Sequence, residues 1–374
     1  MDFSSEVTPI QQVQADFALE FLKRLPTSTV VSPFSIATAL AMTYGGADGS
    51  TRKEMKAVLA KDVEDTVLHE YLSETTKNLA KTSGDTFVET ANKIFVQAGY
   101  SILSDFEAFL ELFYGGNIEQ VDFKNASAVA QEINSWVTSK TRGHIKNLID
   151  SNIITDLTRL ILVNAAYFKG IWLTRFNESA TEEETFHVAP GVEKKVAMMR
   201  CRGHFNLVET QKAKVLNLPY TDHNLSMFLV LPRERYGLQE FVHNLNGDEL
   251  LKLIDSRWQK EVYVKIPKFK LESSFDLSST LENMGIRDAF DKLKADFSKI
   301  TEKPEHYISN VVHKAFLEVD EKGTTAAAAT GVSMSMFLSC NPMPQYETFY
   351  ADHGFMYIVV HTPTRAILFA GTYN

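Results

Sequence analysis

Apolar residues recur with the helical period through most of the first 150 residues. Residues 86–97 break this period and alternate as a strand does. The first part of the chain is therefore expected to be mainly helical, with one strand inside it. The predicted helices span residues 13–25, 35–44, 52–59, 65–81, 104–116 and 128–143.

From about residue 157 onward, short apolar runs of strand length replace the helical pattern. No repeat, low-complexity tract or linker rich in Pro, Gly and Ser divides the chain. We therefore predict one α+β domain over residues 1–374, with more than one sheet. Two short helices, 238–244 and 276–284, separate strands predicted over residues 157–172, 193–200, 214–220, 225–232, 261–272, 307–319, 355–362 and 366–372.

One segment, residues 321–345, fits neither pattern. Small residues come first, and an alternation of period two follows, which is typical of a strand that needs a neighbouring sheet. Alanine and glycine are nevertheless poor strand formers, and so long a loop is unusual in a compact domain unless it is functional. Taken alone, the segment is interpreted equally well as such a strand or as an alanine-rich linker or short helix.

Sequence motifs elsewhere in the chain decide between these interpretations. They include SPFSIATALAMTYGGADGST (32–51), LVNAAYFKGIW (162–172), LPYTDHNLSMFLVLP (218–232) and NVVHKAFLEVDEKGTTAAAA (310–329). The ordered set resembles the serpin family over essentially the whole chain. The resemblance implies an α+β fold with three β-sheets, about nine helices and an exposed reactive-centre loop, about residues 321–349. It also implies that the loop inserts into the main sheet after a protease cuts it, an established property of that family.

The resemblance places the hinge of this loop in a run of mostly small residues. A bulky or charged side chain near Thr324 would lose its water as the sheet opens, at a cost of several kcal/mol. Relatives that no longer inhibit often carry such a residue, so this hinge resembles that of an inhibitory serpin. The hinge comprises Glu321, Lys322, Gly323, Thr324, Thr325, Ala326, Ala327, Ala328 and Ala329.

Other matched positions surround the sheet that opens. Trp172 resembles the aromatic residue where the loop enters, and Lys268 and Glu321 match positions that form an ion pair in some relatives. Without the resemblance, a satisfied buried histidine is the simpler interpretation of His313. A small polar cluster beneath the opening point of the sheet is matched by Ser32, Ser35, Asn164 and His313.

The bond offered to the protease follows from the constrained length of the inserted strand. In inhibitory relatives it usually lies seventeen residues from the hinge glutamate, counted inclusively, which gives Phe337–Leu338 here, with Met336 and Ser339 as register alternatives. Phe337 suits the wide apolar pocket of chymotrypsin-like enzymes and cathepsin G, whereas Met336 or Leu338 suits elastase-like enzymes. No Arg or Lys occurs in residues 324–364, which argues against a trypsin- or thrombin-like target.

Composition and charge narrow the possible partners. The chain carries 38 Lys and Arg against 47 Asp and Glu, a formal net charge of −9, which argues against nucleic acid. No stretch approaches 18 uncharged apolar residues, so no membrane partner is expected.

The first residues lack the layout of a cleavable signal peptide, which leaves localisation open between the cytoplasm and the extracellular space. Cys201 and Cys340 form neither a disulfide framework nor a zinc cage, so no metal is expected.

The chain contains no GxSxG, HExxH, P-loop or GxGxxG motif, so neither an enzyme nor a cofactor is expected. The sequence predicts a monomeric suicide-substrate inhibitor of a chymotrypsin-, cathepsin G- or elastase-like serine protease, which forms a covalent acyl complex. Two alternatives remain open: a non-inhibitory serpin that acts as carrier, chaperone or storage protein, and an inhibitor of a cysteine protease. A covalent complex that resists denaturant distinguishes an inhibitor from a non-inhibitory serpin.

Overall fold

The computed structural model describes residues 6–81, 86–255, 258–303, 305–324 and 346–374. Helices dominate the first part of the chain and strands the rest, as the apolar periodicity predicts. The nine α-helices of the described residues are α1 (Pro9–Arg24), α2 (Pro33–Tyr44), α3 (Gly49–Leu59), α4 (Asp65–Leu79), α5 (Ser104–Tyr114), α6 (Ala126–Lys140), α7 (Leu238–Asn244), α8 (Gly247–Asp255) and α9 (Ser278–Met284).

Local sequence explains where the first two helices begin. The backbone N–H of Thr8 donates to Gln11 Oε1 at 3.0 Å, and Pro9 occupies the first helical position. Helix α1 therefore starts before residue 13, its predicted first residue. Helix α2 likewise starts with a proline, Pro33, and every one of its residues is buried. It is the central helix of the fold.

Each run predicted to be extended contains a strand, although several boundaries differ. The predicted strand 193–200 is part of a strand of 18 residues, and the predicted run 261–272 is divided at Lys268. The strands of the described residues are β1 (Val30–Val31), β2 (Phe87–Gln97), β3 (Ile118–Val121), β4 (Leu160–Ile171), β5 (Glu182–Ala189), β6 (Val192–Glu209), β7 (Ala213–Pro219), β8 (Leu225–Pro232), β9 (Gln259–Pro267), β10 (Phe269–Asp276), β11 (Ile308–Val319), β12 (Gly323–Thr324), β13 (Glu347–Tyr350), β14 (Phe355–His361) and β15 (Ala366–Tyr373).

The hydrogen bonds of the described strands form two sheets, where the resemblance implies three. A six-stranded sheet has the order β10-β11-β12-β4-β2-β3, and a nine-stranded sheet has the order β1-β15-β14-β8-β7-β6-β9-β13 with β5 on β6. The long strand β6 explains the difference in number. Its first part pairs with β5 and β9, and its last residues pair with β7, so it joins two layers into one continuous sheet.

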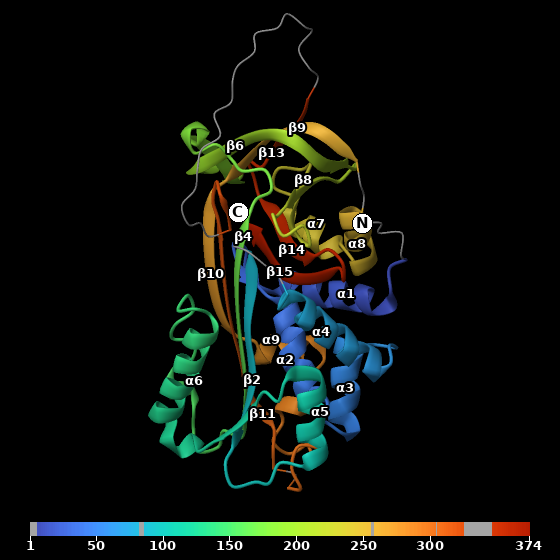
Figure 1. The fold of residues 1–374 in the computed structure, drawn as a ribbon, viewed down its shortest axis with the longest axis vertical. Coiled ribbons are helices and arrows are strands. Elements are labelled where there is room, and N and C mark those ends of the chain that lie inside the picture. The colour runs from blue at the N-terminus through green and yellow to red at the C-terminus, as the bar shows by residue number, and fades with distance from the viewer. Residues whose placement is uncertain (1–5, 82–85, 256–257, 304, 325–345) are drawn as a thin grey trace, which may run out of the picture.

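The six-stranded sheet has a hydrophobic core on each of its faces. Along β4, Leu160, Leu162 and Phe168 pack into the larger core, whereas Ile161 and Tyr167 pack into the smaller one. Burial on both faces explains why β4 is apolar along most of its length, with Asn164 as the exception among its first nine residues. Figure 1 shows α6 on one face of this sheet and α2, α5 and α9 on the other, with β6, β9 and β13 at the end of the molecule above it.

Candidate functional site

Strand β12 is the part of the predicted hinge that the structure describes as a strand. Thr324 pairs antiparallel with Val319 of β11 on one side and with Gly170 of β4 on the other. Both residues of β12 are buried. A Cβ atom at Gly323 would lie 1.9 Å from the carbonyl oxygen of Gly170, so this position requires glycine. The hinge therefore begins inside the six-stranded sheet.

The side chain of Thr324 is held by an aromatic cluster, in which sequence reasoning identified Trp172 but missed Tyr220. Its hydroxyl lies 2.9 Å from the hydroxyl of Tyr220, in a fully buried hydrogen bond. The Tyr220 ring stacks on Trp172 with ring centroids 4.5 Å apart and meets Phe168 edge-on. A Cβ atom at Gly170 would lie 2.6 Å from Tyr220 Cδ1, so glycine in β4 makes room for the ring. The hydrogen bond to Tyr220 thus holds the start of the predicted hinge against this aromatic cluster.

Trp172 also fixes the backbone that precedes the hinge. Its indole Nε1–H donates to the carbonyl oxygen of Asp320 at 2.9 Å, and its backbone N–H donates to that of Lys322 at 3.0 Å. The backbone N–H of Phe176 donates to the carbonyl oxygen of Glu321 at 2.9 Å. Trp172 is 1% exposed, so these bonds are shielded from water. Trp172 therefore lies beside residues 320–322, where the predicted loop starts.

Glu321 and Lys268 form the ion pair that the resemblance implies. Lys268 Nζ lies 2.8 Å from Glu321 Oε2, and Thr181 Oγ1 donates to Glu321 Oε1 at 2.8 Å. Burial alone would raise the pKa of Glu321, but the bonds from Lys268 and Thr181 outweigh it and hold that pKa below its usual value. Glu321 is therefore ionised at neutral pH, and it connects the predicted hinge to Lys268, between β9 and β10, and to Thr181, just before β5.

The predicted polar cluster lies further along the seam, which we define as the line where β4 and β11 pair directly. His313 and Asn164 face each other across the seam, and Asn164 faces Asn92 of β2 on its other side. Asn164 Nδ2 donates to Ser35 Oγ at 2.7 Å, and Ser35 Oγ donates to Asn92 Oδ1 at 2.8 Å. The cluster therefore joins three strands to helix α2. Sequence reasoning missed Asn92.

His313 is neutral and has hydrogen-bond partners on both ring nitrogens. The backbone N–H of Ser32 donates to Nε2 at 3.2 Å, so Nδ1 carries the proton and donates to Asn164 Oδ1. Burial lowers the pKa of His313 to about 3. Ser32 Oγ in turn donates to the carbonyl oxygen of Leu368 at 2.6 Å. The arrangement is that of a structural histidine, as the simpler interpretation of the sequence expects.

The neutral state of His313 predicts a loss of stability in acid. The unfolded chain binds a proton at this residue below its ordinary pKa of 6.5, whereas the folded protein does so only near pH 3. The free energy of unfolding should therefore fall by about 1.4 kcal/mol per pH unit from this residue as pH drops through that window. Urea unfolding of the protein and of His313→Gln at pH 7.5 and 5.0 measures this. Equal pH dependence in the two proteins would contradict the assignment.

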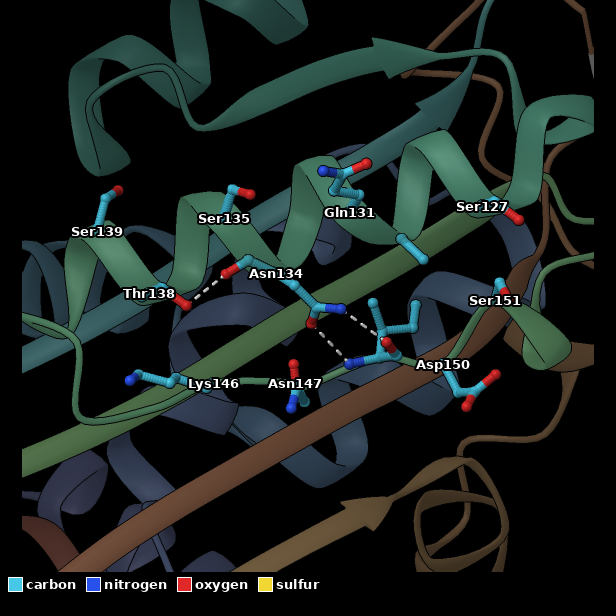
Figure 2. Close-up of a pocket in the computed structure, with 12 residues that line it drawn as sticks. Ser127, Gln131, Asn134, Ser135, Thr138, Ser139, Lys146, Asn147, Asp150 and Ser151 are labelled. Carbon is cyan, nitrogen blue, oxygen red and sulfur yellow. Dashed lines mark hydrogen bonds between the residues drawn. The ribbon is translucent and has the colours of Figure 1, made fainter.

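Helix α6 covers the seam from the other face of the sheet and is tied to the segment that follows it. Asn134 Oδ1 accepts from the backbone N–H groups of Leu148 and Ile149 at 2.7 and 3.0 Å, and its Nδ2 donates to the carbonyl oxygen of Ile149 at 2.9 Å. Figure 2 shows this contact in a groove lined by hydroxyl and amide side chains of α6 and by residues 146–151. Asn134 thus holds this segment against the helix.

The predicted site residues form two groups along one strand. Trp172, at the end of β4, lies with Lys268 and the residues 321–324, and Asn164, in the middle of β4, lies with the polar cluster. No sequence signal distinguishes the missed Asn92, because β2 also contains the polar residues Glu89, Thr90 and Lys93. Several predicted residues lie outside the described part of the chain: Thr325, Ala326, Ala327, Ala328, Ala329, Met336, Phe337, Leu338, Ser339 and Cys340.

The described residues hold no group of three or more His, Cys, Asp or Glu side chains that could bind a metal ion. Across the same ranges, none of the helices is both long enough and apolar enough to cross a membrane.

Comparison with known proteins defines the class. A family model described as serpin (serine protease inhibitor) matches residues 12–374. Leukocyte elastase inhibitor A of Mus musculus is 36% identical over 375 residues, which cover 95% of this chain and 96% of that protein. Serpin B6 of Pongo abelii is 36% identical over 376 residues, which cover 98% and 99%. The native-state crystal structure of the thermophilic serpin tengpin matches with a TM-score of 0.89 at 29% identity, covering 100% of this chain and 96% of that one.

The chain belongs to the serpin family. Its α+β fold is the fold of its structural relatives, and it is not a catalytic enzyme, because the protease inhibitors to which it is related are not enzymes.

Proposed function

We propose that this serpin inhibits a serine protease as a suicide substrate, with a reactive loop of about residues 321–349. The single observation that carries the proposal is the position of β12. It lies antiparallel between β4 and β11, which run parallel to each other. A strand that grows from β12 would replace one parallel pair by two antiparallel pairs, which are slightly more stable per residue.

The free energy released by this insertion is large enough to support inhibition by this mechanism. A dozen new backbone hydrogen bonds at about 0.5–1.5 kcal/mol each stabilise the inserted state by roughly 6–18 kcal/mol. The other end of the proposed loop is also fixed, because β13 starts at Glu347 and pairs with β9. Cleavage between these two anchors would free the segment after β12 while leaving the sheet intact.

The proposed covalent step is the first half of ordinary peptide hydrolysis. The serine oxygen of the protease attacks the carbonyl carbon of Phe337, and its proton passes to the catalytic base. The bond from that carbon to the nitrogen of Leu338 breaks, and the amine leaves with a proton. An ester between Phe337 and the protease serine remains. Insertion of the loop before water reaches this ester would leave the protease covalently bound.

The proposed targets are chymotrypsin-, cathepsin G- or elastase-like proteases. Phe337 suits a wide apolar pocket, and Met336 or Leu338 in a shifted register suits an elastase-like one. The similarity to a leukocyte elastase inhibitor supports the second possibility. We propose that the inhibitor acts as a monomer.

Incubation with chymotrypsin and with elastase tests the proposal directly. We expect a complex that survives denaturing electrophoresis at the summed mass of the protease and the large inhibitor fragment. Complete cleavage with no such complex would favour the alternative, a non-inhibitory serpin. A complex formed only with a papain-like enzyme would instead identify an inhibitor of cysteine proteases.

Loop cleavage should also stabilise the protein. Because the severed strand can complete the six-stranded sheet, we expect the melting temperature to rise by roughly 8–23 °C, which is the hydrogen-bond energy above divided by an unfolding entropy of about 0.8 kcal/mol/K for a chain of 374 residues. A non-target protease that cuts within residues 325–345, followed by calorimetry of intact and cut protein, measures this. Equal melting temperatures would argue against insertion.

A further inference from the structure

The seam between β4 and β11 ends at an aromatic pair. Tyr167 and Phe316 form the last rung at which the two strands pair directly, and beyond it β12 lies between them. The two rings are 5.9 Å apart between centroids and point into the smaller core, on the face covered by α6. Any longer inserted strand has to part this pair first.

A third ring covers the pair from outside the sheet. His144, in the segment after α6, stacks on Tyr167 with centroids 4.0 Å apart and planes 9° apart. The ammonium group of Lys270, on β10, lies 5.0 Å from the centre of the Phe316 ring. We call His144, Tyr167 and Phe316 the aromatic clasp. Its members come from three separate segments, so it holds both strands and the covering segment together.

The register of β12 indicates when the clasp would have to open. Thr324 is opposite Gly170 on one side and Val319 on the other. Continued in that register, the strand would bring its third further residue, Ala327, between Tyr167 and Phe316. The two strands would then be separated by one additional strand spacing of about 4.8 Å, which takes the rings beyond the range of aromatic contact.

We propose that opening of the aromatic clasp sets the rate at which the sheet accepts a strand. This proposal rests on the proposed function, because the rate decides whether the loop inserts before water releases the protease. Side chains of the clasp would therefore determine the partition between inhibition and simple cleavage of the loop. These side chains act by holding the sheet closed.

Uptake of a synthetic strand tests the clasp without any protease. The probe is a labelled peptide of residues 325–337, which continues β12, and its binding to the intact protein is followed on native gels. Aromatic pairs contribute enough beyond burial to change a rate by about two- to tenfold. We expect Phe316→Leu to accelerate uptake within that range. His144→Ala, which changes an exposed residue and leaves the core intact, should act in the same direction.

Phe87→Leu is the matched control. Phe87 contacts the same Tyr167 ring at 6.1 Å, but it lies on β2, which does not have to separate from β4. Its uptake rate should equal that of the unchanged protein. Three outcomes would contradict the proposed role of the clasp: equal rates in all four proteins, equal acceleration by Phe87→Leu, or no uptake by any protein. If the clasp variants take up the peptide faster but the protein forms no covalent complex with any protease, the proposed function is refuted and the proposed role of the clasp is supported.

Discussion

Replacement of Thr324 by arginine is expected to turn the inhibitor into a substrate. Thr324 is fully buried in β12, and its hydroxyl is bonded to that of Tyr220. A guanidinium group at this position would have to lose its water among aromatic rings, at a cost of several kcal/mol. Insertion would then be slower than hydrolysis of the acyl bond. We expect the yield of covalent complex with chymotrypsin to fall at least tenfold, measured on denaturing gels.

Two comparisons separate this effect from a loss of folding. Thr324→Ser keeps the hydroxyl and the small volume, so it should form complex at nearly the original yield. Uncleaved Thr324→Arg should still unfold in one cooperative transition, because only the two-residue strand β12 has to leave the sheet to keep the charged side chain in water. Lys322 already carries a charge nearby, in contact with Glu178 at 3.3 Å, so charge at the start of the hinge is tolerated. An undiminished complex in Thr324→Arg would contradict insertion.

The sequence predicted those helices and strands that are specified by the apolar pattern of their own residues. Strand β4 was predictable because eight of its nine successive buried residues are apolar. Helix α8 was missed, since its three buried leucine and isoleucine side chains fall within only nine residues. Strands β12 and β13 are defined by partners far away in the sequence, β4, β11 and β9. No local pattern specifies such pairings: the alternation from Thr324 onward indicated only a strand that needs a neighbouring sheet, and β13 was not predicted.

The same limit applies to the candidate site. Trp172, Lys268 and Glu321 were predicted from matched motifs, and the structure brings them together. Tyr220 was missed because a tyrosine at the end of a predicted strand has no distinguishing pattern. Its importance comes from the glycine opposite, Gly170, which lets the ring reach the hinge. The period of apolar residues along the chain contains no information about which distant positions meet in space. Roles that depend on such a contact could therefore not be predicted from it.

Replacement of Phe337 by alanine is expected to weaken inhibition of chymotrypsin most strongly. If Phe337 fills the primary pocket of the protease, truncation removes most of the apolar surface that enters it. By analogy with core truncations, loss of a buried aromatic costs about 3 kcal/mol or more, which is over a hundredfold in the association rate constant. Elastase accepts small residues, so its inhibition should change far less. Progress curves with both proteases measure the two rate constants.

Mass spectrometry of the fragment released on complex formation locates the bond independently. Cleavage after Phe337 gives a new amino terminus at Leu338, which is the expected result. A terminus at Phe337 or Ser339 would shift the register by one residue and transfer the predicted rate loss to Met336→Ala or Leu338→Ala. Cleavage near Met343 would contradict the count from Glu321, because the inserted strand would then be six residues longer than the family pattern implies. The position of this terminus therefore decides which side chain the target protease reads.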